Sequence, residues 1–250
     1  MAAPSTGAAD SRDIGSEVIA SFHLIRYAGA DAMRYMAFDR PLLRRTRGLP
    51  FWRLLGTGRG RSMSLGADLR RWALFAVWDG ESALEEFLAA SPVAARWREE
   101  AEESWHVRLA PLGSRGRWGG RDPFADAAPP ARRPRAGPVA VLTRASIRPS
   151  RLVAFYRSVP GVDAELRRRD GCLASIGVGE WPLARQATFS LWRDEAAMTR
   201  FAYRTDAHRT VIDRVRGEDW YAEELFARFI PYASEGTWDG RDPLSLHRPG

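Results

Sequence analysis

The chain contains the same six-residue pattern twice. The pattern W-x-G-R-D-P spans Trp118–Pro123, here called the first hexad, and Trp238–Pro243, the second hexad. A recurrence of this length indicates two copies of one module of roughly a hundred residues. Such a unit is too long for a solenoid repeat, so we expect two domain-sized copies packed against each other as an intramolecular dimer.

The match between the copies extends upstream of the hexads. Ala73–Asp79 corresponds to Ala187–Arg193, which lies 114 positions later. Gly56–Gly58 corresponds to Gly177–Gly179, 121 positions later. A further pair at 121 positions is Val18–Phe22 and Val139–Thr143. The spacing changes between elements, as insertions in loops would produce.

Hydrophobic periodicity predicts the order βαββαβ in each copy, which is the ferredoxin-like unit. In the first copy we expect strands at 17–26, 51–58, 71–78 and 104–111, and helices at 30–45, 81–90 and 92–103. In the second copy we expect strands at 139–147, 173–179, 186–192 and 224–232, and helices at 151–169, 195–203 and 206–217. The fold class is therefore α+β, with tandem ferredoxin-like repeats forming an intramolecular dimeric α/β barrel.

Composition divides the chain into four parts. Residues 1–16 are rich in Ala, Ser, Gly and Asp and predict a disordered tail, and 17–125 form the first repeat. Residues 126–138 contain four prolines, which favour a linker, and 139–244 form the second repeat. Neither a signal-peptide core nor an apolar run of the roughly 20 residues that a membrane span needs is present, so we expect a cytoplasmic protein without an integral membrane segment.

The charge of the chain is strongly positive, but it carries little information about a partner. All 38 basic residues are Arg, and the formal net charge is +7. The arginines are scattered along the chain, so a nucleic-acid partner is not expected. The lone Cys172 excludes an internal disulfide and a multi-cysteine metal site, and we expect it to be a core thiol.

One histidine marks a difference between the copies. Ser91–Ala94 aligns with Thr205–His208, so His208 replaces an alanine of the first copy. On the expected helix, His208 shares a face with Val211, Ile212 and Val215. A neutral imidazole on the inward face of a helix suits a haem iron. The alternative is a surface histidine bonded to backbone.

The other histidines give weaker signals. His23 lies on the strand face opposite Phe22 and Leu24, where it lines a pocket or is solvated. His106 is expected to be structural or exposed, and His247 lies in a polar tail. The sequence contains neither a zinc or non-haem iron spacing nor a hydrolase motif. The paired glycines lack the strand–turn–helix context of a dinucleotide site, and they favour a bend or the close approach of a flat ligand.

Two arginines are candidates for an anionic ligand group. Arg216 and Arg228 flank the acidic and aromatic run 219–226 and could bind haem propionates or an acidic substrate group. The alternative for each is a surface salt bridge.

Several motifs together resemble the spheroidene monooxygenase family over 17–242. They are Phe51-Trp52, Gly56–Gly58, Ala76–Trp78, Ser91-Pro92, Ile176–Glu180, Ala207–Arg216, Trp220 with Glu223–Phe229, and Gly236–Asp242. The resemblance implies a dimeric α/β barrel that holds haem b and oxidises a hydrophobic polyene, the carotenoid spheroidene, with O2 and electrons from a reduced ferredoxin or similar donor. It also implies that His208 is the proximal iron ligand.

The resemblance leaves the substrate open, and a secondary-metabolite oxidase of the family would look alike. The alternatives are a cofactor-independent oxygenase with His208 as base, a haem dehydratase of the same barrel class, and a non-catalytic haem carrier. The sequence does not identify a distal catalytic residue. We expect one haem per chain, held by the C-terminal half, and a substrate cavity shaped by aromatic residues. Candidates for the cavity are Phe22, Phe75, Phe189 and Trp192.

Overall fold

The computed structural model describes residues 18–29, 32–58, 67–127, 137–151, 171–181, 185–204 and 220–245. Its strands are β1 (Ile19–Tyr27), β2 (Phe51–Gly58), β3 (Ala67–Trp78), β4 (Ala101–Gly116), β5 (Val139–Ile147), β6 (Cys172–Trp181), β7 (Arg185–Trp192) and β8 (Tyr221–Gly236). Its helices are α1 (Ala32–Arg45), α2 (Glu81–Ala90), α3 (Pro92–Glu100), the 3-10 turn η1 (Pro149–Arg151) and α5 (Glu195–Arg204). Nearly all of the helix expected at 151–169, the helix expected at 206–217 and most of the linker lie outside the described residues.

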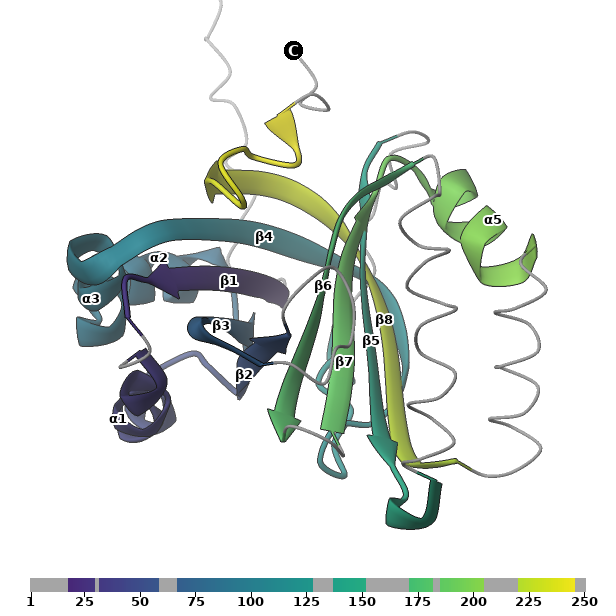
Figure 1. Cartoon of the computed structure of the whole chain (residues 1–250), viewed down its shortest axis with the longest axis horizontal. Coiled ribbons are helices and arrows are strands. Elements are labelled where there is room, and N and C mark those ends of the chain that lie inside the picture. Colours follow the sequence, from purple (N-terminus) through teal and green to yellow (C-terminus); the bar gives the residue numbers. More distant parts are fainter. Residues whose placement is uncertain are drawn as a thin grey trace, which may run out of the picture.

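The eight strands form one closed antiparallel barrel in the order β1-β3-β2-β6-β7-β5-β8-β4 (Figure 1). The first-half strands therefore lie in the order β4-β1-β3-β2, and the second-half strands in the same order, β8-β5-β7-β6. The α+β class and the barrel predicted from the sequence are confirmed.

The halves meet along two strand pairs, β4 with β8 and β2 with β6, here called the long seam and the short seam. On the long seam, Trp105 of β4 pairs with Gly236 of β8, and Gly116 pairs with Leu225. On the short seam between β2 and β6, Gly56 lies opposite Gly179. In each seam the residue pairs stay the same when the two halves are exchanged, so an approximate two-fold axis passes through both seams.

The strand registers correct part of the alignment made from the sequence. Ile19 pairs with Trp78 and Val139 pairs with Trp192, so Ile19 is equivalent to Val139, one position away from the predicted match. Gly56 pairs with Trp72, and Gly179 pairs with Gln186, the equivalent of Trp72. Gly56 therefore corresponds to Gly179, whereas we had expected Gly177. The strand pairings, rather than the matching glycine spacing, decide this correspondence.

Five strands are longer than predicted: β6 and β7 slightly, and β3, β4 and β8 by more, since β8 spans Tyr221–Gly236 where 224–232 was expected. β3 begins at Ala67, inside the segment expected to be a loop. β4 begins at Ala101, where a helix was expected, and continues past Pro111 to Gly116. The register shifts between Pro111 and Gly113, so the strand accommodates a proline at an irregularity and then continues along β8.

The hexads close the barrel interior. The interior is a cluster of apolar side chains that includes Trp118 of the first hexad and Trp238 of the second. Near its centre, the rings of Phe22 and Phe189 are stacked, with centroids 4.1 Å apart. The hexads follow β4 and β8, which are antiparallel, so they cover opposite ends of the barrel. The repeated motif is thus a pair of aromatic plugs.

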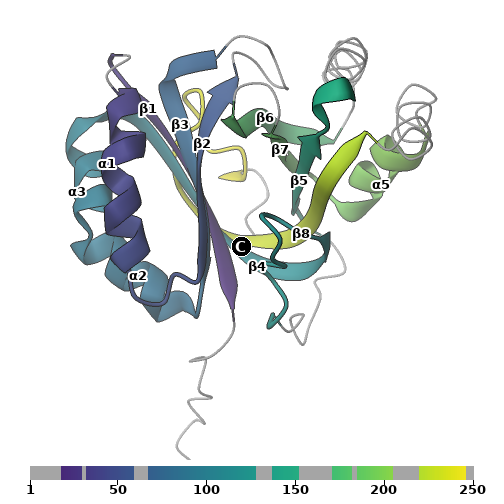
Figure 2. The same ribbon diagram turned by 90° about the horizontal axis from the view of Figure 1, so that it is seen from below.

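Helices cover the outer face of the sheet. In Figure 2, α1, α2 and α3 lie against the first-half strands and α5 lies on the far side, over the second half. Ser91 caps α3 by accepting a hydrogen bond from the N–H of Val93 at 3.2 Å, as its place before Pro92 predicts.

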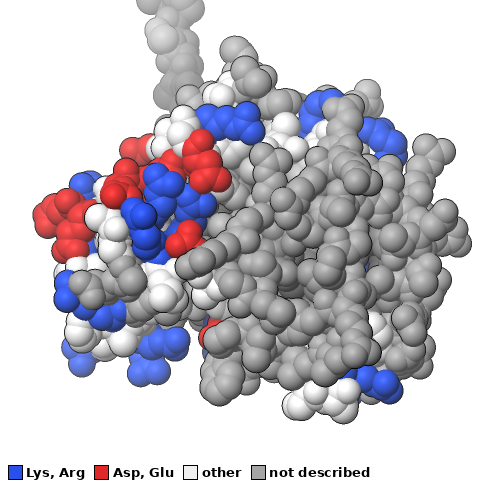
Figure 3. Space-filling model, viewed as in Figure 1, with Lys and Arg blue, Asp and Glu red and all other residues white. Residues whose placement is uncertain are grey.

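Charged side chains of both signs lie side by side over the first half in Figure 3, rather than forming a surface of one sign. Within the described ranges, no helix combines the length and apolarity that crossing a membrane requires.

Candidate functional site

The described residues include only one of the three predicted cofactor-binding residues. His208 and Arg216 lie outside them. Arg228 on β8 pairs with Glu195 of α5 at 2.6 Å, and its side chain is 29% exposed. Arg228 therefore forms the interaction that we had named as its alternative role, at the outer face of the second half.

The aromatic residues expected to shape a substrate cavity are instead packed. Phe22, Phe75 and Phe189 lie inside the barrel and are completely buried. Trp192 lies on the outer face, where its indole N–H donates to the Ser190 hydroxyl at 3.0 Å. Three of these four candidates are thus structural core, because the barrel interior is filled to close contact by side chains from all eight strands.

The outer faces of the two halves differ strongly at equivalent positions. The strand registers make Trp72 equivalent to Gln186 and Leu74 equivalent to Thr188. On the neighbouring strands, Trp52 is equivalent to Ser175, Leu54 to Gly177, Ile25 to Ala145 and His23 to Thr143. Each first-half side chain is larger than its second-half counterpart. At these positions the described second-half side chains therefore fill less of the space between sheet and helices than their first-half counterparts do.

A polar atom on the second-half face lacks a partner. Ser175 is 4% exposed, and its hydroxyl forms no hydrogen bond within the described structure. A buried hydroxyl without a partner costs about 1–3 kcal/mol, so such groups are rare unless they serve a ligand. Thr143 and Thr188 add two hydroxyls to the same face. The face therefore combines small side chains with polar groups.

The same layer of the first half holds a buried histidine pair. The Nδ1 atoms of His23 and His106 are 2.9 Å apart, and His23 Nε2 lies 2.8 Å from the Ser21 hydroxyl. Trp78 donates its indole N–H to that hydroxyl at 2.8 Å. All these polar atoms have a partner when Trp78 donates to Ser21, the Ser21 hydroxyl donates to His23 Nε2, and the His23 Nδ1–H donates to His106 Nδ1. The ring of Trp97 covers both imidazoles.

Burial keeps this pair neutral. It lowers the pKa of His106 to about 4, because the charged imidazolium would lose its hydration. Burial lowers the pKa of His23 even more strongly, and the nearby His106 and Arg108 add to the effect. A neutral, satisfied pair behind α2 and α3 fits a structural role, which we had expected for His106.

Comparison with known proteins places the chain in a family. No family model matches it. It is 36% identical to the spheroidene monooxygenase of Rhodobacter capsulatus, over 91% of this chain and 95% of that protein. It is 38% identical to the spheroidene monooxygenase of Rubrivivax gelatinosus, over 83% of this chain and 78% of that protein. The chain belongs to the spheroidene monooxygenase family.

Membership of the spheroidene monooxygenase family makes the chain an oxidoreductase of the monooxygenase class. A solved aldoxime dehydratase shares the fold, with a TM-score of 0.53 and 13% identity, over 95% of this chain and 85% of that one. That likeness concerns architecture only.

Sequence reasoning missed the pairing of His23 with His106. It also missed the loss of side-chain volume on the second-half face. The histidine pair needed the register between β1 and β4, which no local pattern reports. The volume difference was visible in principle, because Leu74 and Thr188 stand at matching positions beside the conserved pair Phe75 and Phe189 of the two copies.

Proposed function

We propose that the chain is a haem-dependent monooxygenase of the spheroidene monooxygenase type. It oxidises a hydrophobic substrate, a carotenoid or a related secondary metabolite, with O2 and electrons from a reduced ferredoxin or a similar donor. The observation that carries the proposal is the outer face of the second half, where Ser175, Gly177 and Thr188 stand in place of Trp52, Leu54 and Leu74. The names of the curated relatives support the reaction class and the kind of substrate.

The described residues fit a flat, largely apolar group such as haem b. Gly177 brings backbone close to the space in front of the sheet, and the unpartnered hydroxyl of Ser175 supplies a polar contact. His208 would hold the iron, and Arg216 and Arg228 would bind the propionates. Binding a propionate at Arg228 would mean exchanging its ion pair with Glu195. Bound haem would supply the iron that activates O2.

The remaining residues of the face exclude water and orient the substrate. Val141, Trp192 and Phe226 form an apolar layer over the second-half strands. Such a layer favours a long hydrophobic substrate over a polar one, and a few hydroxyls fix its position. The hydroxyls of Thr143 and Thr188 are suited to fixing the position of the substrate.

A titration with hemin tests the proposal. We expect the purified chain to bind hemin with a Soret shift, and we expect His208→Ala to lose or disturb this band. His247→Ala is the matched control, because it removes an imidazole from the polar tail and should leave the spectrum unchanged. A wild-type chain that gives no Soret shift would refute the haem assignment.

Turnover separates the remaining readings. The proposal expects product from a carotenoid such as spheroidene only with haem, O2 and reductant together. Turnover without haem would indicate a cofactor-independent oxygenase, and turnover without O2 and reductant would indicate a dehydratase. Haem binding without any turnover would indicate a carrier.

We also interpret each half as a ferredoxin-like unit. The first half has the element order β1-α1-β2-β3-α2-α3-β4, and both halves share one strand order in the sheet. Fusion of two such units, followed by loss of large side chains on one outer face, would produce one site per chain.

A further inference from the structure

A polar cavity of about 560 Å³ opens beside the first hexad. This volume lies in the range of about 300–1,000 Å³ that is typical of small-molecule sites. Its charged lining consists of five arginines and two glutamates: Arg40 and Arg44 of α1, Arg53 of β2, Arg121 of the first hexad, Arg144 of β5, Glu180 of β6 and Glu223 of β8. The excess of guanidinium groups makes the cavity suited to an anion.

The two glutamates are already engaged by the two inner arginines. Arg144 is 3% exposed and forms ion pairs with Glu223 and, at 3.7 Å, with Glu180. Arg53 pairs with Glu180 at 2.9 Å. Burial opposes the charge of Glu223, but the N–H groups of the first hexad and Arg144 outweigh it and lower the pKa of that carboxyl. The inner arginines and the glutamates thus balance each other.

Arg144 also keeps an unused donor. Its Nε atom is buried and has no hydrogen-bond partner in the described part of the chain. An unsatisfied donor on a buried guanidinium is costly, and an acceptor arriving in the cavity would relieve that cost.

The three outer arginines have no counter-charge. Arg40, Arg44 and Arg121 are exposed, and none forms an ion pair with any residue that the structure describes. Phe51 and Trp52 add an apolar wall. The cavity thus combines an uncompensated positive mouth with a surface for carbon atoms.

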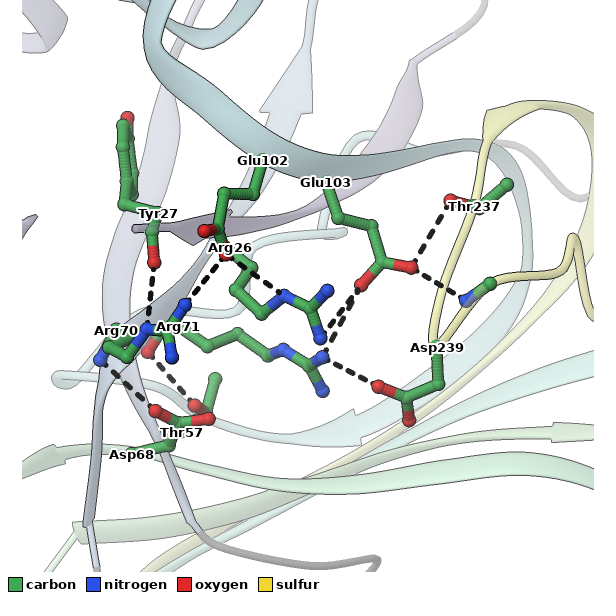
Figure 4. A network of polar contacts seen from close by, with 11 residues as sticks. Arg26, Tyr27, Thr57, Asp68, Arg70, Arg71, Glu102, Glu103, Thr237 and Asp239 are labelled. Carbon is green, nitrogen blue, oxygen red and sulfur yellow. Dashed lines mark hydrogen bonds and ion pairs between the residues drawn. The ribbon is translucent and has the colours of Figure 1, made fainter. Parts of the chain in front are cut away.

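At the equivalent end of the barrel, beside the second hexad, the described arginines of β1 and β3 are paired with carboxylates. There, Arg70 pairs with Glu102 at 2.7 Å, and Arg71 pairs with Asp239 at 2.6 Å (Figure 4). Arg26 lies within 3.8 Å of Glu102 and within 3.6 Å of Glu103. Three arginines therefore form ion pairs with three carboxylates.

Arg144 stands where the second-hexad end has Leu24, and three further substitutions between the copies change the charge at the two ends. The registers make Arg26 equivalent to Ser146 and Glu103 equivalent to Glu223. By the same register Glu102 is equivalent to Ala222, and Asp239 takes the place of Gly119 in its hexad. The first-hexad end has therefore lost two carboxylates and gained the open volume that their side chains would fill.

We propose that this cavity, here called the arginine pocket, binds a small organic anion whose carboxylate or phosphate groups replace the two missing carboxylates. The planar guanidinium groups bind either oxyanion in a bidentate manner. Phe51 and Trp52 contact the carbon part of the ligand. The pocket is separate from the proposed haem face, so anion binding requires neither haem nor turnover.

The test is the exchange Gly119→Asp, which gives the first hexad the residue of the second. The fold tolerates the change, because Gly119 has φ +66° and Asp239 occupies the same left-handed region at φ +53°. A Cβ at position 119 would lie 2.8 Å from the terminal Nη2 of Arg53, a flexible side-chain end that can shift. The new carboxylate would then neutralise the pocket as Asp239 neutralises Arg71.

The probes are pyrophosphate and citrate, measured by calorimetry at low ionic strength, where screening is weak. We expect the wild-type chain to bind at least one of them, and the tighter one distinguishes phosphate from carboxylate recognition. Gly119→Asp should weaken binding about tenfold or more. Asp239→Gly is the matched control, because it removes a carboxylate at the opposite end and should leave this binding unchanged.

A second variant guards against misfolding of Gly119→Asp. Arg40→Gln with Arg44→Gln changes only exposed positions on α1 and should also weaken binding. The proposal is overturned if the wild-type chain binds neither probe, or if both the folded Gly119→Asp variant and the double variant bind as tightly as the wild type.

Discussion

On the first half of the barrel, the outer sheet face carries Trp72 and Leu74 beneath α1, α2 and α3, and both side chains are completely buried. At the equivalent positions of the second half stand Gln186 and Thr188. The inner faces share some residues, such as Phe75 and Phe189 at matching places of one interior, and differ at others, where Arg144 stands in place of Leu24. The outer face where sheet and helices meet is thus one of the places where the two copies differ.

This contrast separates stability from function within one fold. A copy that fills its own sheet–helix space gains the free energy of burying aromatic and aliphatic surface. A copy that leaves the space open gives up part of that free energy and gains a place for a ligand. Exchanging residues between the halves, or removing a feature that only one half has, tests this separation.

The largest expected effect comes from giving the second half the side chains of the first. Thr188→Leu with Gly177→Leu installs the counterparts Leu74 and Leu54 on the outer face. We expect this double variant to lose the Soret shift on hemin titration, because the added side chains occupy the proposed haem space. Thr188→Leu alone, which avoids any backbone strain at Gly177, should weaken hemin binding as well.

The reverse exchange is the control. Leu74→Thr should leave hemin binding intact but lower the free energy of unfolding by about 2–4 kcal/mol, as lost burial and a cavity do. Denaturant unfolding measures this loss. If Leu74→Thr abolished hemin binding while the two leucine substitutions did not, the roles assigned to the halves would be reversed.

The histidine pair gives the first half a pH dependence that the equivalent residues of the second half, Thr143 and Phe226, cannot provide. The pKa of His106 falls to about 4 in the folded chain, below its ordinary value of about 6.5. Above about pH 6.5 this group therefore takes nothing from the free energy of unfolding. That free energy falls as the pH drops towards 4, because the unfolded chain takes up the proton first. For His106 the loss is about 3 kcal/mol.

His106→Phe tests this dependence by supplying the counterpart residue, Phe226. Unfolding followed by denaturant at several pH values should show a shallower loss of stability below pH 6.5 in the variant than in the wild type. Equal slopes would mean that the pair does not stay neutral in the folded chain.

The sequence alone predicted the barrel and its order of elements well, because strands such as β1 and β7 carry clear alternation and the hexads mark the repeat. It misjudged β3 and β4, whose added residues, 67–70 and 101–103, are rich in charged side chains and pair with neighbouring strands. Local patterns do not encode such pairing.

The candidate site was harder to predict than the fold. Comparison of the copies pointed to His208, and the acidic and aromatic run pointed to Arg216; both remain predictions outside the described residues. The contrast between the two outer faces depends on which residue of β6 matches which residue of β2, and only the strand pairings decide that match. The unpaired arginines depend on Asp239 standing where the first hexad has Gly119. Both differences between the copies are present in the sequence, but only the strand pairings show which residues stand at equivalent positions.

The smallest expected effect concerns two serines, one on each outer face. Ser21 accepts the indole N–H of Trp78 and contacts His23, so Ser21→Ala should lower the free energy of unfolding by about 1–3 kcal/mol. The Ser175 hydroxyl has no such partner among the described residues, so Ser175→Ala should change that free energy by less than about 0.5 kcal/mol without haem. With hemin present, Ser175→Ala should lose part of the stabilisation that the ligand gives the wild type. Thermal or denaturant unfolding with and without hemin measures all three values, and a large haem-free loss in Ser175→Ala would show that this hydroxyl serves the fold rather than a ligand.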